Sequence, residues 1–233
     1  MNTVKRLVLA AVVVAVALPA AAFAYFNFIQ DPAPKRLTLD SGTTSTTAGS
    51  AGTASASGDL SGTDLSGTWR PTSASQVGYR VNEVAFGQRK AAVGRTNKVT
   101  GTMNVSGTTV SAVDLTVDMT SVSSDESRRD NQFQGRIMNT SRFPTATFKL
   151  TSPVALSSTS GPVTVKATGD LTVRGTTRPV TVELKAQRQG AGIAVNGSIP
   201  VVFGEWGIPN PSFGPVSTED HGELELLVVF AKA

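Results

Sequence analysis

The sequence predicts an all-β domain of eight antiparallel strands with one short helix, preceded by an N-terminal membrane helix and a flexible tether. Apolar and polar residues alternate repeatedly from residue 67 to the C-terminus, and a period of two residues is typical of strands with one buried face. The residues before 67 lack this alternation, because a long apolar run is followed there by a stretch of small residues. The 233 residues therefore suffice for one domain with extensions.

The apolar run at residues 7–29 predicts a transmembrane anchor. It is apolar except for Asn27 and about as long as the ~20 residues that a membrane helix needs. The alternative is a cleaved signal peptide, in which Pro19 ends the apolar core and residues 22–24 form an A-x-A cleavage site. In both cases the basic residues of segment 1–6 keep the N-terminus in the cytoplasm, and the rest is exported. We therefore expect the domain in the cell envelope, either membrane-anchored or, after cleavage, periplasmic or secreted.

Residues 30–66 predict a flexible linker ahead of a domain at residues 67–233. From residue 38 onward the linker consists mostly of Ser, Thr, Gly and Ala, a composition that cannot form a packed core. As a random coil, the Ser/Thr/Gly/Ala-rich stretch of ~29 residues has its ends about 30 Å apart. A tether of this length suits a domain that works near a membrane surface.

The composition excludes several kinds of site and partner. The chain has no cysteine, which removes disulfides, thiolate metal sites and cysteine nucleophiles. Residues 1–66 carry four basic and four acidic side chains, so the net charge of +4 lies on the domain. This charge fits contact with anionic head groups. Nucleic acid is not expected as a partner, because the domain is exported and lacks interleaved basic and aromatic residues.

Eight segments of the domain alternate apolar and polar residues and are expected to form strands. The clearest pair is a hairpin, in which residues 163–174 and 180–184 place their apolar side chains on one face. Something apolar must cover that face, and either protein core or lipid would do so. The expected strands, in order, are residues 77–82, 99–105, 113–119, 146–150, 163–174, 180–184, 193–203 and 224–230.

One short helix is expected between the third and fourth strands, where the period changes. Ser123 and Glu126 have the spacing of a capping box. Phe133, Ile137 and Met138 are spaced to share one side of the helix, so this side is expected to close one end of a barrel.

Eight antiparallel strands predict a closed barrel, with a two-sheet sandwich as the alternative. Closure removes exposed strand edges, and a barrel of this size is either just filled by side chains or holds one small ligand. Gly101, Gly169 and Gly197 fall at inward positions. They either leave room for a ligand or allow the strands to bend.

The domain resembles the YceI-like family in four segments: GTWRPTSASQVGYRV, SVSSDESRRDNQFQGRIMNTSRFPTATF, GDLTVRGTTRPVTV and FGEWGI. The resemblance implies a lipocalin-like barrel of the bacterial cell envelope. It also implies that the barrel binds a long isoprenoid lipid (a polyprenol, polyprenyl phosphate or isoprenoid quinone) without catalysis or cofactor. The chain departs from the family around the first strand, where it lacks the histidines that many members carry.

Two groups of residues are candidates for the lipid site. The lumen is expected to be lined by Met103, Leu115, Val117, Phe133, Ile137, Phe148, Leu171, Leu184 and Trp206. Trp206 serves equally well as a core residue. The second group is a cationic rim that would receive a pyrophosphate or phosphate head group, unless these residues only make the surface soluble: Arg128, Arg129, Arg136 and Arg142.

The sequence gives little support for an enzyme. His221 is the only histidine, and we expect it in a solvated turn, so no metal site is expected. Glu223 and Glu225 alternate outward on a strand and are expected to face solvent. The alternative to a lipid carrier is a filled barrel that acts as a membrane-tethered surface interaction module.

Overall fold

The computed structural model describes residues 33–39, 57–58, 65–85, 87–156 and 162–233. The expected N-terminus 1–6 and membrane helix 7–29 lie outside these residues, as does most of the expected linker. Among the residues that the structure describes, no helix is long and apolar enough to cross a membrane.

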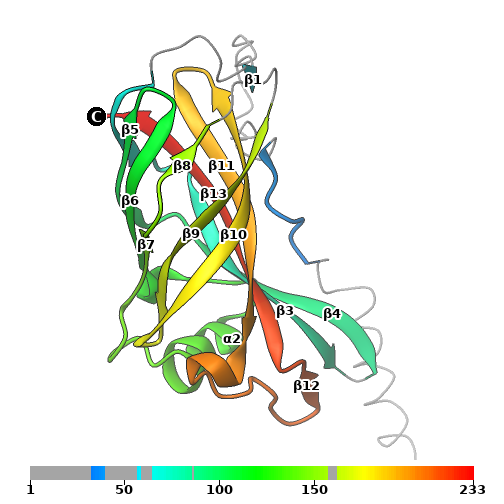
Figure 1. Cartoon of the computed structure of the whole chain (residues 1–233). Helices are drawn as coiled ribbons and strands as arrows, with labels where there is room; N and C mark the ends of the chain where they lie inside the picture. Colours follow the sequence, from blue (N-terminus) through cyan, green and yellow to red (C-terminus); the bar gives the residue numbers. More distant parts are fainter. Residues whose placement is uncertain (1–32, 40–56, 59–64, 86, 157–161) are drawn as a thin grey trace, which may run out of the picture.

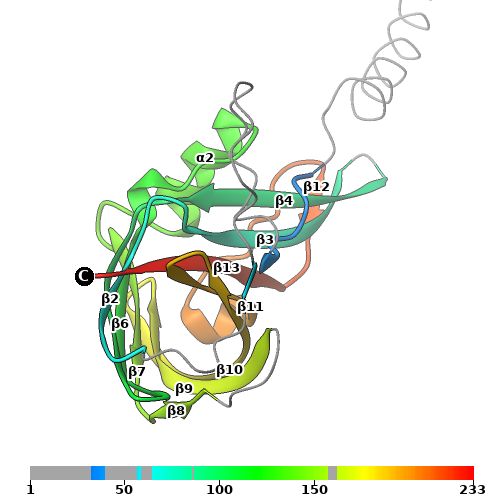
Figure 2. The same cartoon turned by 90° about the horizontal axis from the view of Figure 1, so that it is seen from above.

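Eight antiparallel strands close into a barrel, which Figure 2 shows from above as a ring. Going round the ring, the order is β2, β5, β6, β7, β9, β10, β11 and β13, and β13 pairs again with β2. The strand bounds are β2 Gly67–Pro71, β5 Val99–Ser106, β6 Thr109–Asp118, β7 Thr145–Leu150, β9 Val163–Val173, β10 Thr176–Gln189, β11 Gly192–Val202 and β13 His221–Lys232.

A second hairpin extends the barrel wall at one end. β3 (Gln76–Ala85) pairs with the first half of β13, and β4 (Gln88–Thr96) pairs with β3. Figure 1 shows this hairpin projecting sideways at the end of the barrel that carries the helix. Three short strands complete the sheet: β12 pairs with β3, β1 with β10 and β8 with β6. Their bounds are Val216–Thr218, Ser57–Gly58 and Val154–Ala155.

The closed barrel confirms the predicted fold class. Each of the eight expected strands lies inside an observed strand or overruns it by one residue. The sequence analysis missed β2 and β4. β2 has only five residues, and β4 buries three consecutive residues, 92–94, so neither shows a clear alternation.

The expected helix forms, but it starts differently from the prediction. An α-helix, α2 (Ser127–Gln132), continues into a π-helical turn, η4 (Phe133–Ile137). The predicted capping box is wrong, because Glu126 itself caps the helix and its carboxylate accepts from the Arg128 amide. Ser123 instead forms a bridge with Arg95 of β4. Two short 3₁₀ turns, η3 (Met119–Ser121) and η5 (Phe203–Trp206), follow β6 and β11.

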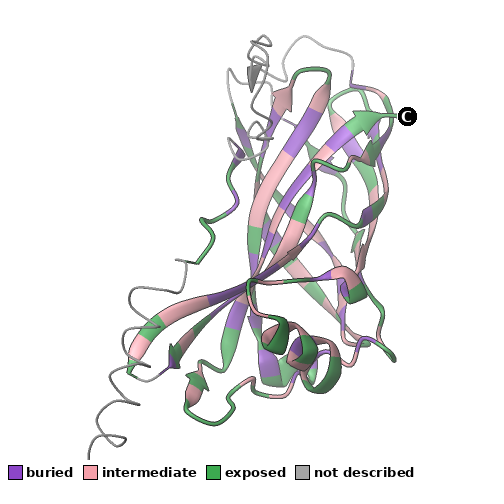
Figure 3. Cartoon of the chain, turned by 180° about the vertical axis from the view of Figure 1, so that it is seen from behind, coloured by how far each residue is buried: buried purple, intermediate pink, exposed green. Residues whose placement is uncertain are grey.

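Two clusters of buried side chains occupy the two ends of the barrel, and Figure 3 shows the buried positions in purple. We call the end that carries the β5–β6 turn the turn end, and its cluster includes Trp69 and Phe230. The helix end carries α2, and its cluster includes Phe133 and Trp206. At the turn end, the Trp69 indole donates to the Leu65 carbonyl at 2.8 Å. Leu65 is buried in this cluster, so the packed domain begins slightly before residue 67.

Residues 33–39, which we call the arm, pack on the outside of the barrel, although the sequence analysis placed all of them in the linker. Leu37 and Leu39 are buried against Ala194 of β11 and Leu227 of β13. The arm is the blue segment beside the barrel in Figure 1. The Asn196 side chain donates to the Leu37 carbonyl at 3.0 Å, which fixes the arm along the outer wall.

Candidate functional site

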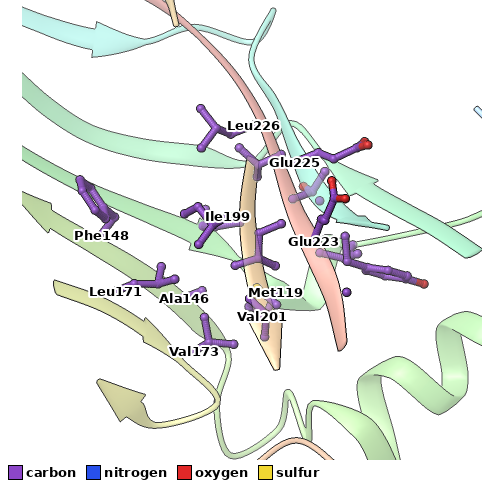
Figure 4. Close-up of a pocket in the computed structure, with 18 of the residues that line it drawn as sticks. Met119, Ala146, Phe148, Leu171, Val173, Ile199, Val201, Glu223, Glu225 and Leu226 are labelled. Carbon is purple, nitrogen blue, oxygen red and sulfur yellow. The ribbon is translucent and has the colours of Figure 1, made fainter. Parts of the chain in front are cut away.

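The barrel encloses a cavity of about 710 Å³. Ligand pockets usually measure roughly 300–1,000 Å³, so this cavity is large enough for an elongated small molecule. Figure 4 shows side chains that meet across it, with Phe148 of β7 and Leu171 of β9 facing Ile199 and Val201 of β11. These side chains come from strands on different sides of the ring, so the cavity occupies the centre of the barrel.

Eight of the nine residues predicted for the lumen lie on the cavity wall. They come from strands β5, β6, β7, β9 and β10 and from the helix, because inward-facing positions on each strand alternate with outward-facing ones. The eight residues are Met103, Leu115, Val117, Phe133, Ile137, Phe148, Leu171 and Leu184.

Trp206 is not on the cavity wall. It lies in η5 at the helix end, where only 3% of its surface is exposed, and it packs in the core cluster of that end. Its carbonyl accepts from the Thr176 hydroxyl at 3.3 Å. Trp206 is therefore a core residue and not a cavity residue, which were the two roles that the sequence left open.

The inward glycines allow close approach of neighbouring strands and of two cavity side chains, Phe148 beside Gly169 and Leu184 beside Gly197. A Cβ at Gly101 would lie 2.0 Å from the Asp114 carbonyl oxygen, and one at Gly169 would lie 2.5 Å from that of Lys149. A Cβ at Gly197 would meet the Leu184 side chain at 2.6 Å. A side chain at Gly101 or Gly169 would push neighbouring strands apart, and one at Gly197 would displace the Leu184 side chain, so close approach accounts for all three.

The predicted cationic rim divides into two pairs. Arg128 and Arg129 lie on the cavity wall at the helix end. Arg136 instead donates to two backbone carbonyls of the loop before β12, each at 3.0 Å. Arg142 stacks over the Phe143 ring at 5.1 Å. Only the first pair is therefore placed to meet a molecule in the cavity.

Arg129 joins the helix to the β3–β4 hairpin. Its guanidinium pairs with Glu83 of β3 at 3.4 Å and with Asp125 just before the helix. Beside it, the Tyr79 ring of β3 stacks on Phe133 with the ring centroids 5.0 Å apart. Burial raises the pKa of Tyr79 well above its ordinary value, despite the opposing effect of Arg129. The phenol therefore stays neutral at the cavity wall.

Glu225 is a buried ionic centre that the sequence analysis did not find. It was expected to face solvent, but only 3% of its surface is exposed. Its carboxylate accepts from Arg80 and Arg95, with the Arg95 contact at 3.0 Å. Glu225 is among the residues that line the cavity, but Figure 4 shows its carboxylate pointing away from apolar side chains such as Phe148 and Leu171. The alternation along β13 correctly predicted that the Glu225 side chain points outward, but the arm covers this side chain.

The arm completes this ionic cluster. Arg36 pairs with Glu223 and lies 3.6 Å from Glu225. The Arg80 guanidinium donates to the Pro34 carbonyl at 2.7 Å, and Arg95 donates to the Lys35 carbonyl. The hydrogen bond from Arg36 lowers the pKa of Glu223, so this carboxylate is ionised at neutral pH. No sequence pattern predicts the cluster, because the three arginines are far along the chain from the two glutamates.

The only histidine lies away from the cavity wall. His221 is exposed at the start of β13, where its ring contacts Asp220 at 2.8 Å and Glu219 at 3.5 Å. The hydrogen bond to Asp220 raises the pKa of His221. Within the described residues, no group of three or more His, Asp or Glu side chains is arranged to hold a metal ion.

Comparison with known proteins identifies the domain. Residues 70–230 match the YceI-like domain family, while none of the curated proteins matches the chain. A polyisoprenoid-binding domain from Saccharophagus degradans, implicated in plant cell wall breakdown, is 13% identical, with a TM-score of 0.56 over 71% of this chain and 98% of that one. BcnA from Burkholderia cenocepacia is 20% identical, with a TM-score of 0.54 over 68% and 98%. At these identities, the two structures show a shared fold.

Proposed function

The chain belongs to the YceI-like family, and we propose that its barrel binds the hydrocarbon chain of a long isoprenoid lipid inside the cavity. A polyprenol, a polyprenyl phosphate and an isoprenoid quinone all have such a chain. The similar fold of the polyisoprenoid-binding domain from Saccharophagus degradans supports this proposal. We propose that the protein sequesters or carries the lipid at the cell envelope.

The apolar cavity is the observation that carries the proposal. Protein interiors contain few voids larger than a water molecule, and a dry cavity of about 710 Å³ would forgo packing energy on the order of 10 kcal/mol or more. An apolar ligand restores those contacts, and each CH₂ group that it buries contributes up to about 0.8 kcal/mol. The same cavity weighs against the alternative of a filled barrel that serves only as an interaction module.

We propose binding without catalysis. The cavity wall carries mostly aliphatic and aromatic side chains, and most of its charged residues lie at the helix end, where Arg129 is already paired with two carboxylates. A head group at this end would meet Arg128, which is exposed on the cavity wall. His221, the one imidazole in the chain, is exposed and does not line the cavity.

We also propose that residues 7–29 anchor the protein in the membrane, with the barrel outside the cytoplasm. The apolar length of this run and the basic residues before it support the proposal. Cell fractionation tests the anchor, because an anchored protein stays in the membrane fraction after carbonate extraction. The intact mass of that protein distinguishes an uncleaved anchor from a signal peptide cleaved after residue 24.

Replacing an inward residue with a larger one tests lipid binding directly. Leu115→Trp adds bulk to the middle of the cavity wall, so we expect the purified protein to lose its isoprenoid while the barrel still folds. Native mass spectrometry and lipid extraction measure the bound lipid, and circular dichroism checks the fold.

Asp114→Trp is the matched control on the same strand. Asp114 is exposed on the outside of β6, so this variant should keep the lipid content of the parent. If the parent yields no isoprenoid, or if Leu115→Trp retains as much as Asp114→Trp, the lipid does not occupy the cavity.

A further inference from the structure

The two ends of the cavity differ in their access to solvent. At the turn end the wall consists of buried and partly buried residues, including Val110, Val154 and Leu150, and none of them is exposed. At the helix end it includes exposed residues, among them Phe213 and Pro215 from the loop before β12. The cavity therefore opens at the helix end.

The large apolar side chains that are exposed also gather at the helix end. Among the described residues they are Val84, Val202 and Phe213, with exposed fractions of 38%, 44% and 63%. Phe213 bridges to Val216 of β12, whose neighbour Ser217 pairs with Val84 of β3. Val202 pairs with His221 at the start of β13. Of these three residues only Phe213 lines the cavity, and with Pro215 and Val216 it gives the mouth an apolar edge.

The arm leads the chain toward the same end. Its residue Leu39 packs near Ala194 and Leu227, in the middle of the outer wall. Going back along the chain, the Pro34 carbonyl meets Arg80, which pairs across the sheet with Glu223 near the start of β13. The N-terminal end of the arm therefore points toward the helix end, as the blue segment in Figure 1 shows.

The docked arm also shortens the tether between barrel and anchor. Residue 39 is packed on the barrel, and so is residue 65, so the residues between them do not set the distance to the membrane. Only residues 30–32 separate the apolar run 7–29 from the arm. Three residues span at most about 11 Å, compared with the average of about 30 Å expected for a free linker.

We propose that the helix end of the barrel rests on the lipid bilayer, with Phe213 and Val84 in the interface and the cavity mouth facing lipid. The arm fixes this orientation, because it holds the start of the domain next to the anchor. Exposed charges of both signs, such as Arg89, Arg128, Glu219 and Asp220, surround the mouth, so apolar contact rather than charge carries the proposal. The inference rests on the proposed anchor at residues 7–29.

This orientation would let an isoprenoid chain pass between the bilayer and the cavity without crossing water. Each CH₂ group exposed to water on the way costs about 0.8 kcal/mol, so a mouth in contact with lipid lowers the barrier to loading. A barrel held at a distance would instead expose the whole chain during transfer.

The absence of cysteine allows a site-specific test. A fluorescent probe is attached through Ser217→Cys at the mouth or Thr108→Cys at the turn end, both at exposed residues. Each full-length protein is reconstituted into phosphatidylcholine vesicles that contain nitroxide-labelled lipid. The 12 residues of β13 span about 40 Å along the strand, or roughly 30 Å along the barrel axis at the usual tilt of about 35–45°, so we expect quenching at residue 217 and none at residue 108. Equal quenching at both sites, or quenching at residue 108 alone, would overturn the orientation.

A charge reversal tests the role of the arm. Arg36→Glu places a carboxylate beside Glu223 and Glu225 and should release the arm, so the difference in quenching between the two probes should disappear. Lys35→Glu is the matched control, because Lys35 is exposed and docks through its backbone carbonyl. If Arg36→Glu keeps the full difference, the arm does not set the orientation.

Two further measurements on the same samples separate this inference from the proposed function. Co-sedimentation with the vesicles reports the anchor, and a protein that stays in solution would overturn both the anchor and the orientation. Lipid extraction reports the contents of the cavity. Loss of isoprenoid with normal quenching would count against lipid binding and leave the orientation standing.

Discussion

The two ends of the barrel are closed by different kinds of structure. At the turn end, buried residues from the strands close the barrel, with Trp69 and Phe230 among them. At the helix end, a short helix supplies Phe133 to the core, and an exposed loop carries Phe213. Both ends therefore have a buried core, and only the helix end adds an opening to it. The comparison indicates that both cores contribute to stability and that exchange of a ligand depends on the helix end.

The largest expected effect tests the turn end. Trp69→Ala removes a side chain that is 4% exposed and leaves the Leu65 carbonyl without its indole donor. We expect a loss of about 3–5 kcal/mol in the free energy of unfolding, measured by denaturant titration. Phe213→Ala at the other end is the control and should change this free energy by less than about 0.5 kcal/mol. Comparable losses in both variants would mean that the loop residue Phe213 belongs to a stabilising core and not to an exposed mouth.

A smaller effect is expected for the helix itself. Phe133→Ala removes a buried ring that stacks on Tyr79. Because the void merges with the existing cavity, we expect a loss of about 2–3 kcal/mol, toward the lower end for core truncations. The same variant widens the mouth, so bound isoprenoid should exchange faster with acceptor vesicles. Unchanged exchange would mean that the helix does not limit access to the cavity.

The sequence predicted those parts of the fold that follow from local alternation. In β9, apolar residues such as Leu171 and Val173 alternate with polar ones, and the strand ends within one residue of the expected position. The same alternation identified eight cavity residues, because inward positions on neighbouring strands of a closed barrel face a common centre. Trp206 was misplaced because its loop has no period from which a direction can be inferred.

The parts that the sequence did not predict depend on contacts between distant residues. Arg36 and Glu223 are 187 positions apart, and no adjacent residue in the sequence indicates that they form an ion pair. The composition of residues 30–66 correctly indicates that they cannot form a core of their own. It does not show that Leu37 and Leu39 can bury themselves on a core formed by other residues. The local sequence pattern does not predict docked segments of this kind, because their burial depends on distant residues.

A third prediction concerns the arm, which leads toward the helix end. Arg36 lowers the pKa of Glu223, so this pair stabilises the folded state above the ordinary glutamate pKa of 4.5 and loses that contribution as pH falls through the lowered value. Both side chains are partly exposed, so Arg36→Gln should cost less than about 1 kcal/mol at pH 7. Denaturant titrations across the pH range should show this difference shrinking below pH 4.5. A difference that grows on acidification would contradict the assignment.

The smallest expected effect concerns His221, which lies at the helix end but outside the cavity. Its hydrogen bond to Asp220 raises its pKa above the ordinary value of 6.5, so any stabilisation is present below pH 6.5 and disappears as pH rises through the raised pKa. His221→Ala should therefore leave the unfolding midpoint at pH 8 and the lipid content of the protein unchanged. Lipid content is the more informative measurement. The proposal assigns control of loading to the apolar surface of the mouth and not to a titrating group beside it. A pH-dependent loss of isoprenoid in His221→Ala would show instead that the imidazole contributes to the site.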